Sequence, residues 1–291
     1  SSTRYYHIVS RCVRRTYLCG FDNFTQRDYS HRKSCLINRI KSLSKIFSIK
    51  ICAFAVMSNH YHLVLFVDEE QARVWSEEAV RFRWSQLFRG DAEKLEQEET
   101  SGLSKELVSK KVEQWHERLK SISWYMRCLN EPIARMSNSE DKVTGRFWEG
   151  RFKSQALLDE GALLSAMAYV DLNPIRANVA ATPEESAFTS IYERIQYIAK
   201  QQKTHSEEKS LQAMAKVCNA LKQPKDIMPF ANQQKSKKPC IEFNLSDYLQ
   251  LVDETGRVIR QDKKGYISAN LQNILARLQL TSHGWLEMVQ G

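Results

Sequence analysis

The 291-residue sequence lacks the features that mark membrane, secreted or zinc-ribbon proteins. Its longest apolar runs fall well short of the about 18 residues that a transmembrane helix needs. The N-terminus has neither the apolar run nor the small-residue cleavage site of a signal peptide. Seven cysteines stand at irregular spacings without a CxxC pair, so neither a disulfide framework nor a zinc ribbon is indicated. We therefore expect a cytoplasmic protein with reduced, mostly structural thiols and no membrane partner.

The positive charge of the chain is concentrated at one end. The net charge is +9, yet residues 1–67 hold 11 Lys or Arg and 2 Asp or Glu, whereas residues 68–291 hold 32 of each. Such a basic region favours a polyphosphate partner, although many non-binding proteins share this pI. Arg11, Arg14 and Arg15 follow directly on the first predicted strand. For Lys41, Lys45 and Lys50 a solvated helix face is an equally good interpretation.

The first 67 residues predict an alternation of strands and one helix. Residues 5–9 are β-prone, and apolar residues recur at helical spacing over 27–47. Two further apolar runs, 49–57 and 61–67, are separated by the turn residues Ser58-Asn59. The order β-α-β-β is the opening half of a ferredoxin-like antiparallel sheet, so we expect an α+β fold.

The rest of the chain predicts mainly helices. We expect a core over residues 1–182, a helical extension over 183–222 and a C-terminal appendage over 223–291, which begins with a polar linker containing prolines over 223–239. Within the core we expect a helical insertion over 71–112 and an amphipathic helix over 113–136 that Pro132 kinks or divides. A loop and strand over 146–158 and a helix over 160–173 that ends before Pro174 should follow. The appendage should contain short helices over 245–253 and 269–280.

Two histidines lie at strand spacing at the start of the run 61–67. Because side chains alternate along a strand, His60 and His62 point to the same face and can share one metal ion. Two half-buried structural histidines are the alternative, since a ligand set needs a third partner. Further along, Tyr169 and Asn173 are four residues apart and fall on one face of a helix. On spacing alone, a buried tyrosine and an asparagine at the helix C-terminus are the favoured interpretation.

Four blocks, in this order, resemble the single-tyrosine HUH transposases of insertion sequences and their REP-associated relatives. They span about residues 5 to 180 and read YHIVSR at 6–11, AFAVMSNHYHLVL at 53–65, GRFWEGRFK at 145–153 and YVDLNPIRA at 169–177. The resemblance implies a sheet with the histidine pair, a divalent metal such as Mg²⁺ or Mn²⁺, and a nucleophilic tyrosine on an adjacent helix. His60 and His62 match the metal-binding histidines, Tyr169 the nucleophile, and Asn173 a further polar metal ligand.

The same resemblance implies a reaction and a partner. The family cuts single-stranded DNA by attack of the tyrosine on a phosphodiester, which leaves a 5′-phosphotyrosine bond and a free 3′-OH, and then rejoins strands. Because the covalent bond conserves the energy of the broken one, no nucleotide cofactor is needed. The absence of a GxxxxGK[ST] motif agrees with this. The expected partner is DNA with hairpins or palindromic repeats, bound by a monomer or homodimer.

Basic and aromatic residues alternate in the third block. Arg146, Arg151 and Lys153 are candidate DNA contacts, and Phe147, Trp148 and Phe152 could stack on bases. Core aromatic residues on a strand are the alternative. Tyr61, between the histidines, points to the opposite face, so we expect it to pack or to contact DNA rather than act as the nucleophile.

Two other functions remain open at this point. One is a domesticated DNA-binding protein that keeps the fold and has lost strand cleavage. The other is a two-histidine phosphoesterase that releases free products. A covalent tyrosyl–DNA adduct distinguishes the transposase from both.

Overall fold

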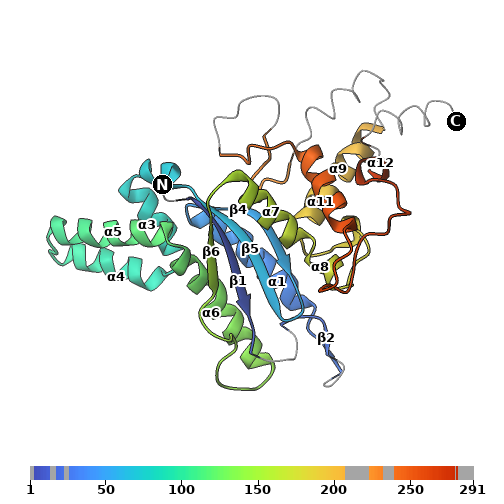
Figure 1. Ribbon diagram of the computed structural model, residues 1–291. Coiled ribbons are helices and arrows are strands. Elements are labelled where there is room, and N and C mark those ends of the chain that lie inside the picture. The colour runs from blue at the N-terminus through green and yellow to red at the C-terminus, as the bar shows by residue number, and fades with distance from the viewer. Residues whose placement is uncertain are drawn as a thin grey trace.

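A computed structural model describes residues 3–13, 18–22, 26–206, 223–231, 239–278 and 280 of the chain (Figure 1). The predictions for Arg14, Arg15 and Cys218 and for the second half of the 183–222 extension lie outside these residues. Within the described ranges, no helix has the length and apolar composition required to cross a membrane.

The centre of the fold is a four-stranded antiparallel sheet. The strands are β1 (Tyr5–Arg11), β4 (Ile49–Val56), β5 (His60–Val67) and β6 (Lys153–Leu157), in the order β4-β5-β1-β6. The predicted strands of the first 67 residues are therefore confirmed. Two short strands, β2 (Phe21–Asp22) and β3 (Arg27–Asp28), pair separately, and for this reason the first helix begins at His31 rather than at residue 27.

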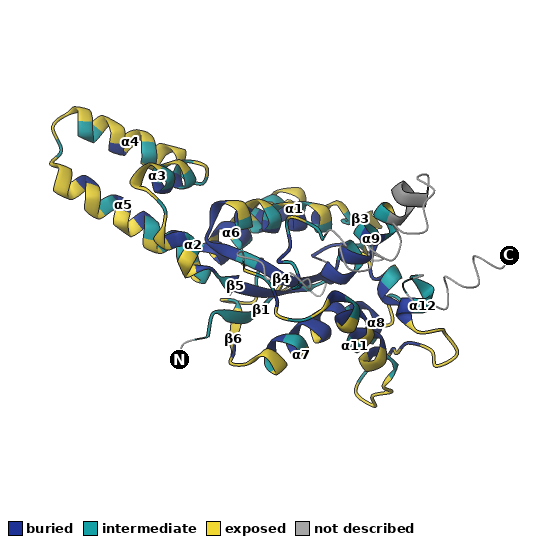
Figure 2. Cartoon of the chain, turned by 90° about the horizontal axis from the view of Figure 1, so that it is seen from above, coloured by how far each residue is buried: buried dark blue, intermediate teal, exposed yellow. Residues whose placement is uncertain are grey.

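Helices cover both faces of the sheet, which explains why β4 and β5 are apolar on both sides. Figure 2 shows α1 (His31–Ile46) and α6 (Ile122–Glu140) on one face and α7 (Glu160–Asp171) on the other. Alternate residues of β5 enter the two cores: Leu63 packs with the α1–α6 cluster, whereas Val64 packs with the α7 cluster. The sheet therefore separates a structural face from the face covered by α7.

The predicted division of the helix at Pro132 is wrong, because the helix runs through Pro132 and is interrupted at Ser121 instead. Ser121 ends α5 (Lys105–Lys120) and precedes α6, and Pro132 lies inside α6. A proline in a helix leaves the carbonyl four residues earlier without its N–H partner. Here that carbonyl, on Cys128, accepts a hydrogen bond from Nε of Arg39 in α1 at 3.2 Å. This contact from a neighbouring helix accommodates the proline.

A group of helices between β5 and α6 projects from the sheet as an arm (Figure 1). It consists of α2 (Glu69–Arg73), α3 (Glu77–Ser85), α4 (Arg89–Thr100) and most of α5. The rings of Trp84 and Trp115 stack at 5.5 Å and hold α3 against α5. Residues 71–112, where composition predicts helices, are thus largely helical.

The C-terminal part of the chain packs on α7. Its elements are α8 (Asn173–Arg176), the 3-10 helix η1 (Pro183–Glu185), α9 (Ser190–Ser206), α11 (Leu245–Arg257) and α12 (Ile274–Arg277). The buried carboxylate of Asp171 accepts hydrogen bonds from Ser190 Oγ and Tyr248 Oη, both at 2.6 Å. These bonds connect α7 to α9 and α11, so residues of the predicted appendage share a core with α7.

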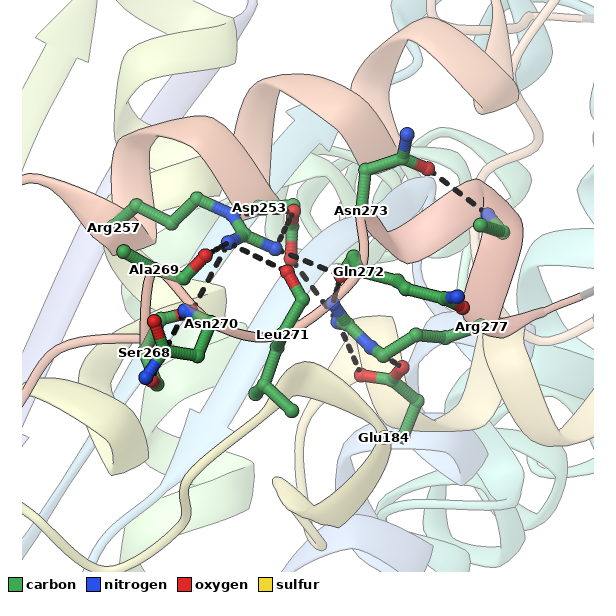
Figure 3. A network of polar contacts seen from close by, with 11 residues as sticks. Glu184, Asp253, Arg257, Ser268, Ala269, Asn270, Leu271, Gln272, Asn273 and Arg277 are labelled. Carbon is green, nitrogen blue, oxygen red and sulfur yellow. Dashed lines mark hydrogen bonds and ion pairs between the residues drawn. The ribbon is translucent and has the colours of Figure 1, made fainter.

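Two segments of this region differ from the sequence predictions. Residues 223–231, where composition predicts a polar linker, pack against β4: Phe230 is buried, and the Met228 N–H donates to the carbonyl of Ile51 at 2.7 Å. The predicted helix over 269–280 is wrong for 269–273, where the chain is irregular. The guanidinium of Arg257 binds the carbonyl oxygens of Ser268, Leu271 and Gln272 there, which a continuous helix would use internally (Figure 3).

Candidate functional site

Three histidines lie together on the sheet face that α7 covers. His60 and His62 of β5 point to this face, as their spacing predicts, with ring centroids 5.0 Å apart. His7 of β1 lies beside them: its Nε2 is 3.0 Å from His62 Nδ1, and the two rings are 5.3 Å apart. His62 is thus flanked on both sides by an imidazole.

His7 was not predicted as a site residue. A single histidine in a β-prone run has no spacing signal, because its neighbours are set by the pairing of β1 with β5. In that register His7 lies opposite Val64 and Val9 lies opposite His62, so all four side chains share one face. Knowledge of this register would have revealed the third imidazole.

Tyr169 is held over these histidines by α7. Asp159 caps the N-terminus of the helix, and its carboxylate accepts a hydrogen bond from the Ala162 N–H at 2.7 Å. The helix buries Leu163 and Met167 against the sheet. The Tyr169 ring lies edge-on to His62 at 5.6 Å and to His7 at 6.0 Å between centroids. With 43% of its surface exposed, the phenol is accessible to a large ligand.

Asn173 lies one turn beyond Tyr169 but belongs to α8, because Pro174 forces a new helix to begin. Its amide nitrogen donates to the carbonyl oxygens of Tyr169 at 3.0 Å and Val170 at 3.4 Å. The amide thus closes the end of α7, which is the structural role considered above. The Oδ1 atom is the group of this side chain that remains for a metal ion.

Burial keeps the three imidazoles neutral. Burial lowers the pKa of His7, and it lowers the pKa of His60 to about 4 and that of His62 to about 3. The positive charge of Arg11, which lies directly opposite His60 across β1 and β5, lowers the pKa of His60 and His62 further. At neutral pH each ring is therefore uncharged and has one N–H group and one nitrogen lone pair.

The hydrogen bonds of His60 and His62 use the Nδ1 atom of each ring and leave the Nε2 atom of each. His60 Nδ1 is 2.6 Å from the Asn59 side-chain oxygen, which can only accept, so Nδ1 carries the proton and Nε2 keeps its lone pair. His62 Nδ1 pairs with His7 Nε2, and in the tautomer in which Nδ1 is the donor, Nε2 of His62 also keeps its lone pair. This arrangement suits metal-binding histidines, whose second ring nitrogen is commonly hydrogen-bonded. Within the described ranges no group of three or more His, Cys, Asp or Glu is placed to hold a metal, so oxygen ligands would have to complete the shell.

The predicted DNA-binding residues fall into two groups. Arg11 is exposed beside His60. Lys153 of β6 is also exposed, and because it lies opposite Val9 of β1 it is on the same face as the histidines. Arg151 instead donates to Ser123 of α6 at 2.9 Å and lies over the Phe152 ring. Arg146 is exposed in the loop before β6.

The aromatic residues near β6 mostly serve the core. Phe147 is buried, and the Trp148 indole N–H donates to the Asn130 carbonyl at 3.0 Å. Tyr61 points away from the histidines as predicted, is fully buried, and donates to the side chain of Asn130. The core interpretation therefore holds for Phe147 and Trp148, and Tyr61 packs rather than facing a ligand.

The chain was compared with protein families, curated proteins and solved structures. No family model matches the chain, and no curated protein matches it. Among solved structures, a REP-associated tyrosine transposase bound to a REP hairpin is similar with a TM-score of 0.41 and 11% identity, covering 67% of this chain and 81% of that one.

The buried histidines predict a pH-dependent stability. In the unfolded chain they bind protons near pH 6.5, whereas in the folded protein His60 and His62 do so only near pH 4 and 3. The free energy of unfolding should therefore fall as the pH decreases from 6.5 toward 4, by about 1.4 kcal/mol per pH unit for each histidine. Urea unfolding between pH 4.5 and 7.5 measures this slope. His60→Asn should reduce this slope, and equal slopes in the wild type and His60→Asn would contradict the prediction.

Proposed function

We propose that this chain is a metal-dependent single-tyrosine nuclease and strand transferase of the HUH type, acting on hairpin-bearing single-stranded DNA. The observation that supports it best is the accessible phenol of Tyr169, 5.6 Å by ring centroids from His62 in a cluster of neutral imidazoles. The strand order β4-β5-β1-β6, with α1 and α6 on one face, supports a ferredoxin-like core for this site.

In the proposed reaction Tyr169 Oη attacks a backbone phosphorus. A bond forms between Oη and phosphorus while the bond from phosphorus to the 3′ oxygen breaks, and the phenolic proton is balanced by the proton that the leaving 3′ oxygen takes up. The product is a 5′-phosphotyrosine and a free 3′-OH, and attack by a 3′-OH reverses the step. A phenol with a pKa near 10 is ionised in only about one molecule in a thousand at pH 7, which costs about 4 kcal/mol.

A divalent ion fits the site through the two free nitrogens. His60 Nε2 and His62 Nε2 would hold it, with Asn173 Oδ1 as the proposed oxygen ligand. When bound, Mg²⁺ or Mn²⁺ supplies Lewis-acid activation of the phosphate. In this proposal His7 holds the ring of His62 through Nδ1 and leaves Nε2 for the ion. Arg11 and Lys153, on the same face, would bind neighbouring phosphates and position the strand without reading its sequence.

The test is direct capture of the intermediate. The protein is incubated with labelled single-stranded hairpin oligonucleotides and Mn²⁺, separated under denaturing conditions, and the attached residue is mapped by mass spectrometry. We expect a denaturation-resistant band with the label on Tyr169. Cleavage without a covalent band would instead identify a two-histidine phosphoesterase, and binding without cleavage would identify a DNA-binding protein.

His7 is expected to act as a positioning residue for His62. His7→Phe keeps an aromatic ring but removes the nitrogen that pairs with His62 Nδ1. Loss of such a partner typically costs a factor of about 10 to 100 in metal affinity, so the Mn²⁺ concentration for half-maximal cleavage should rise by that factor. Electron paramagnetic resonance of free Mn²⁺ measures binding independently of activity. His7→Gln, whose side-chain oxygen can accept from Nδ1, should restore part of the affinity, and unchanged Mn²⁺ binding in His7→Phe would contradict this role.

A further inference from the structure

The segment that follows α11 forms a closed loop next to the candidate site. We call residues 258–266 the C-terminal loop. Its base is closed by the Ile267 N–H, which donates to the Gly256 carbonyl at 2.9 Å, and Ile267 is fully buried. Sequence analysis assigned no role to this loop.

Arg176 of α8 anchors the C-terminal loop to the helix that follows Tyr169. Its guanidinium donates to the carbonyl oxygens of Thr255 at 2.6 Å and Val258 at 2.7 Å, and its own carbonyl accepts from the Lys264 N–H at 3.2 Å. Gly265 fits so closely that a Cβ there would lie 2.0 Å from the Ile175 carbonyl oxygen. The loop is therefore fixed against α8 at both of its ends.

A second set of contacts holds the chain beyond the loop. Asp253 of α11 accepts from Arg257 at 2.9 Å and from Arg277 of α12 at 3.0 Å (Figure 3). Arg257 also binds carbonyl oxygens of the segment that leads to α12, as Figure 3 shows, and Arg277 pairs with Glu184 at 2.6 Å. Because Asp253 is almost completely buried, these bonds support a defined loop position.

The anchored loop carries an exposed cation, Arg260. Arg260 is 51% exposed, and its guanidinium forms a two-bond pair with Asp262, at 2.9 and 3.0 Å. Arg260 lies close enough to Tyr169 for their charges to interact: Asp262 raises the pKa of Arg260 most, and Tyr169 contributes to the increase. Exposed Lys264 and Tyr266 follow on the same loop.

We propose that the C-terminal loop forms a wall of the DNA-binding surface at Tyr169, and that Arg260 binds a backbone phosphate next to the one that Tyr169 attacks. In this proposal Asp262 holds the guanidinium in place in the free protein and is replaced by the phosphate when DNA binds. The inference rests on the proposed function, because that function supplies the DNA strand at Tyr169.

The exchange of partners is physically reasonable. An exposed ion pair contributes little to stability, since water and salt screen it, so Asp262 can be displaced at low cost. A phosphate offers the same two-oxygen geometry to the guanidinium. Its charge is repeated at each phosphate of the strand. Asp262 also repels a phosphate bound nearby, so its carboxylate should weaken DNA binding.

The test compares two ion pairs of the same kind at different places. Arg260 and Asp262 lie on the C-terminal loop that Arg176 anchors to α8, whereas Arg89 and Glu93 form an exposed pair on the helical arm, at 2.7 Å. Affinity for a fluorescein-labelled single-stranded hairpin oligonucleotide is measured by anisotropy, with every variant also carrying Tyr169→Phe so that no covalent product forms. We expect Arg260→Gln to weaken binding about 10-fold or more, and Asp262→Asn to strengthen it several-fold. Arg89→Gln and Glu93→Gln should change it less than 2-fold.

Two further measurements separate the outcomes. Losing one phosphate contact to a single strand should reduce the slope of log affinity against log salt by about 0.7 in Arg260→Gln only. If Arg260→Gln and Arg89→Gln bind alike, or if Asp262→Asn binds no more tightly than Glu93→Gln, the inference is overturned. Failure of the proposed function gives a different result. In that case the protein with intact Tyr169 forms no covalent adduct with any hairpin, whether or not Arg260 contributes to binding.

Discussion

Tyr169→Phe is expected to reduce formation of the covalent protein–DNA adduct by at least about 1000-fold, because the substitution removes the only atom that attacks phosphorus in the proposed reaction. The phenylalanine ring keeps the edge-on contacts that the tyrosine ring makes with His7 and His62. Hairpin binding should therefore change less than 2-fold. Denaturing gels measure the adduct, and anisotropy measures the binding.

The control for this variant is the nearby exposed tyrosine of the C-terminal loop. Tyr266 is 51% exposed, comparable to the 43% of Tyr169, and Tyr266→Phe removes the same atom. At a saturating hairpin concentration Tyr266→Phe should still form the adduct, because the loop is proposed to bind the strand and not to attack phosphorus. An adduct that persists in Tyr169→Phe and disappears in Tyr266→Phe would assign the nucleophile to the loop and refute the mechanism proposed here.

The parts of the site that sequence reasoning reached depend on local periodicity. The two-residue period of a strand fixes His60 and His62 on one face whatever the rest of the fold does. Tyr169 follows from the helical pattern of residues 160–173 and from the resemblance to the transposase blocks. The pairing of Tyr169 with Asn173 was predicted for one helix, but Pro174 places Asn173 at the start of α8. The roles of these residues as nucleophile and ligands stay predictions.

The parts that were missed depend on long-range contacts. His7 joins the cluster only through the register of β1 on β5, which local sequence does not determine. The C-terminal loop reaches the site through Arg176, whose partners Thr255 and Val258 are about 80 residues away in the chain. Pro132 was predicted to kink or divide one helix over 113–136 because the rule for proline is local, whereas the accommodating hydrogen bond comes from Arg39 of α1.

The second large effect is expected for the histidine pair. His60→Ala and His62→Ala each remove one of the two free Nε2 atoms, so metal-dependent cleavage should fall by about 100-fold or more in each variant. His116→Ala, on the helical arm, should keep full activity. Because His62 is 5% exposed, its replacement also leaves a cavity, so loss of activity alone would not separate metal binding from packing.

Thermal unfolding with and without Mn²⁺ distinguishes loss of metal binding from loss of packing. An ion that binds the folded protein stabilises it by about 1.4 kcal/mol when its free concentration is ten times its dissociation constant, and the unfolding midpoint rises accordingly. A packing defect lowers the midpoint equally with and without Mn²⁺, whereas loss of a ligand removes the increase that Mn²⁺ produces. We expect the increase in the wild type and in His116→Ala, and none in His60→Ala or His62→Ala. The same increase in all four proteins would show that the imidazole pair does not hold the ion, and Tyr169 would then need another source of activation.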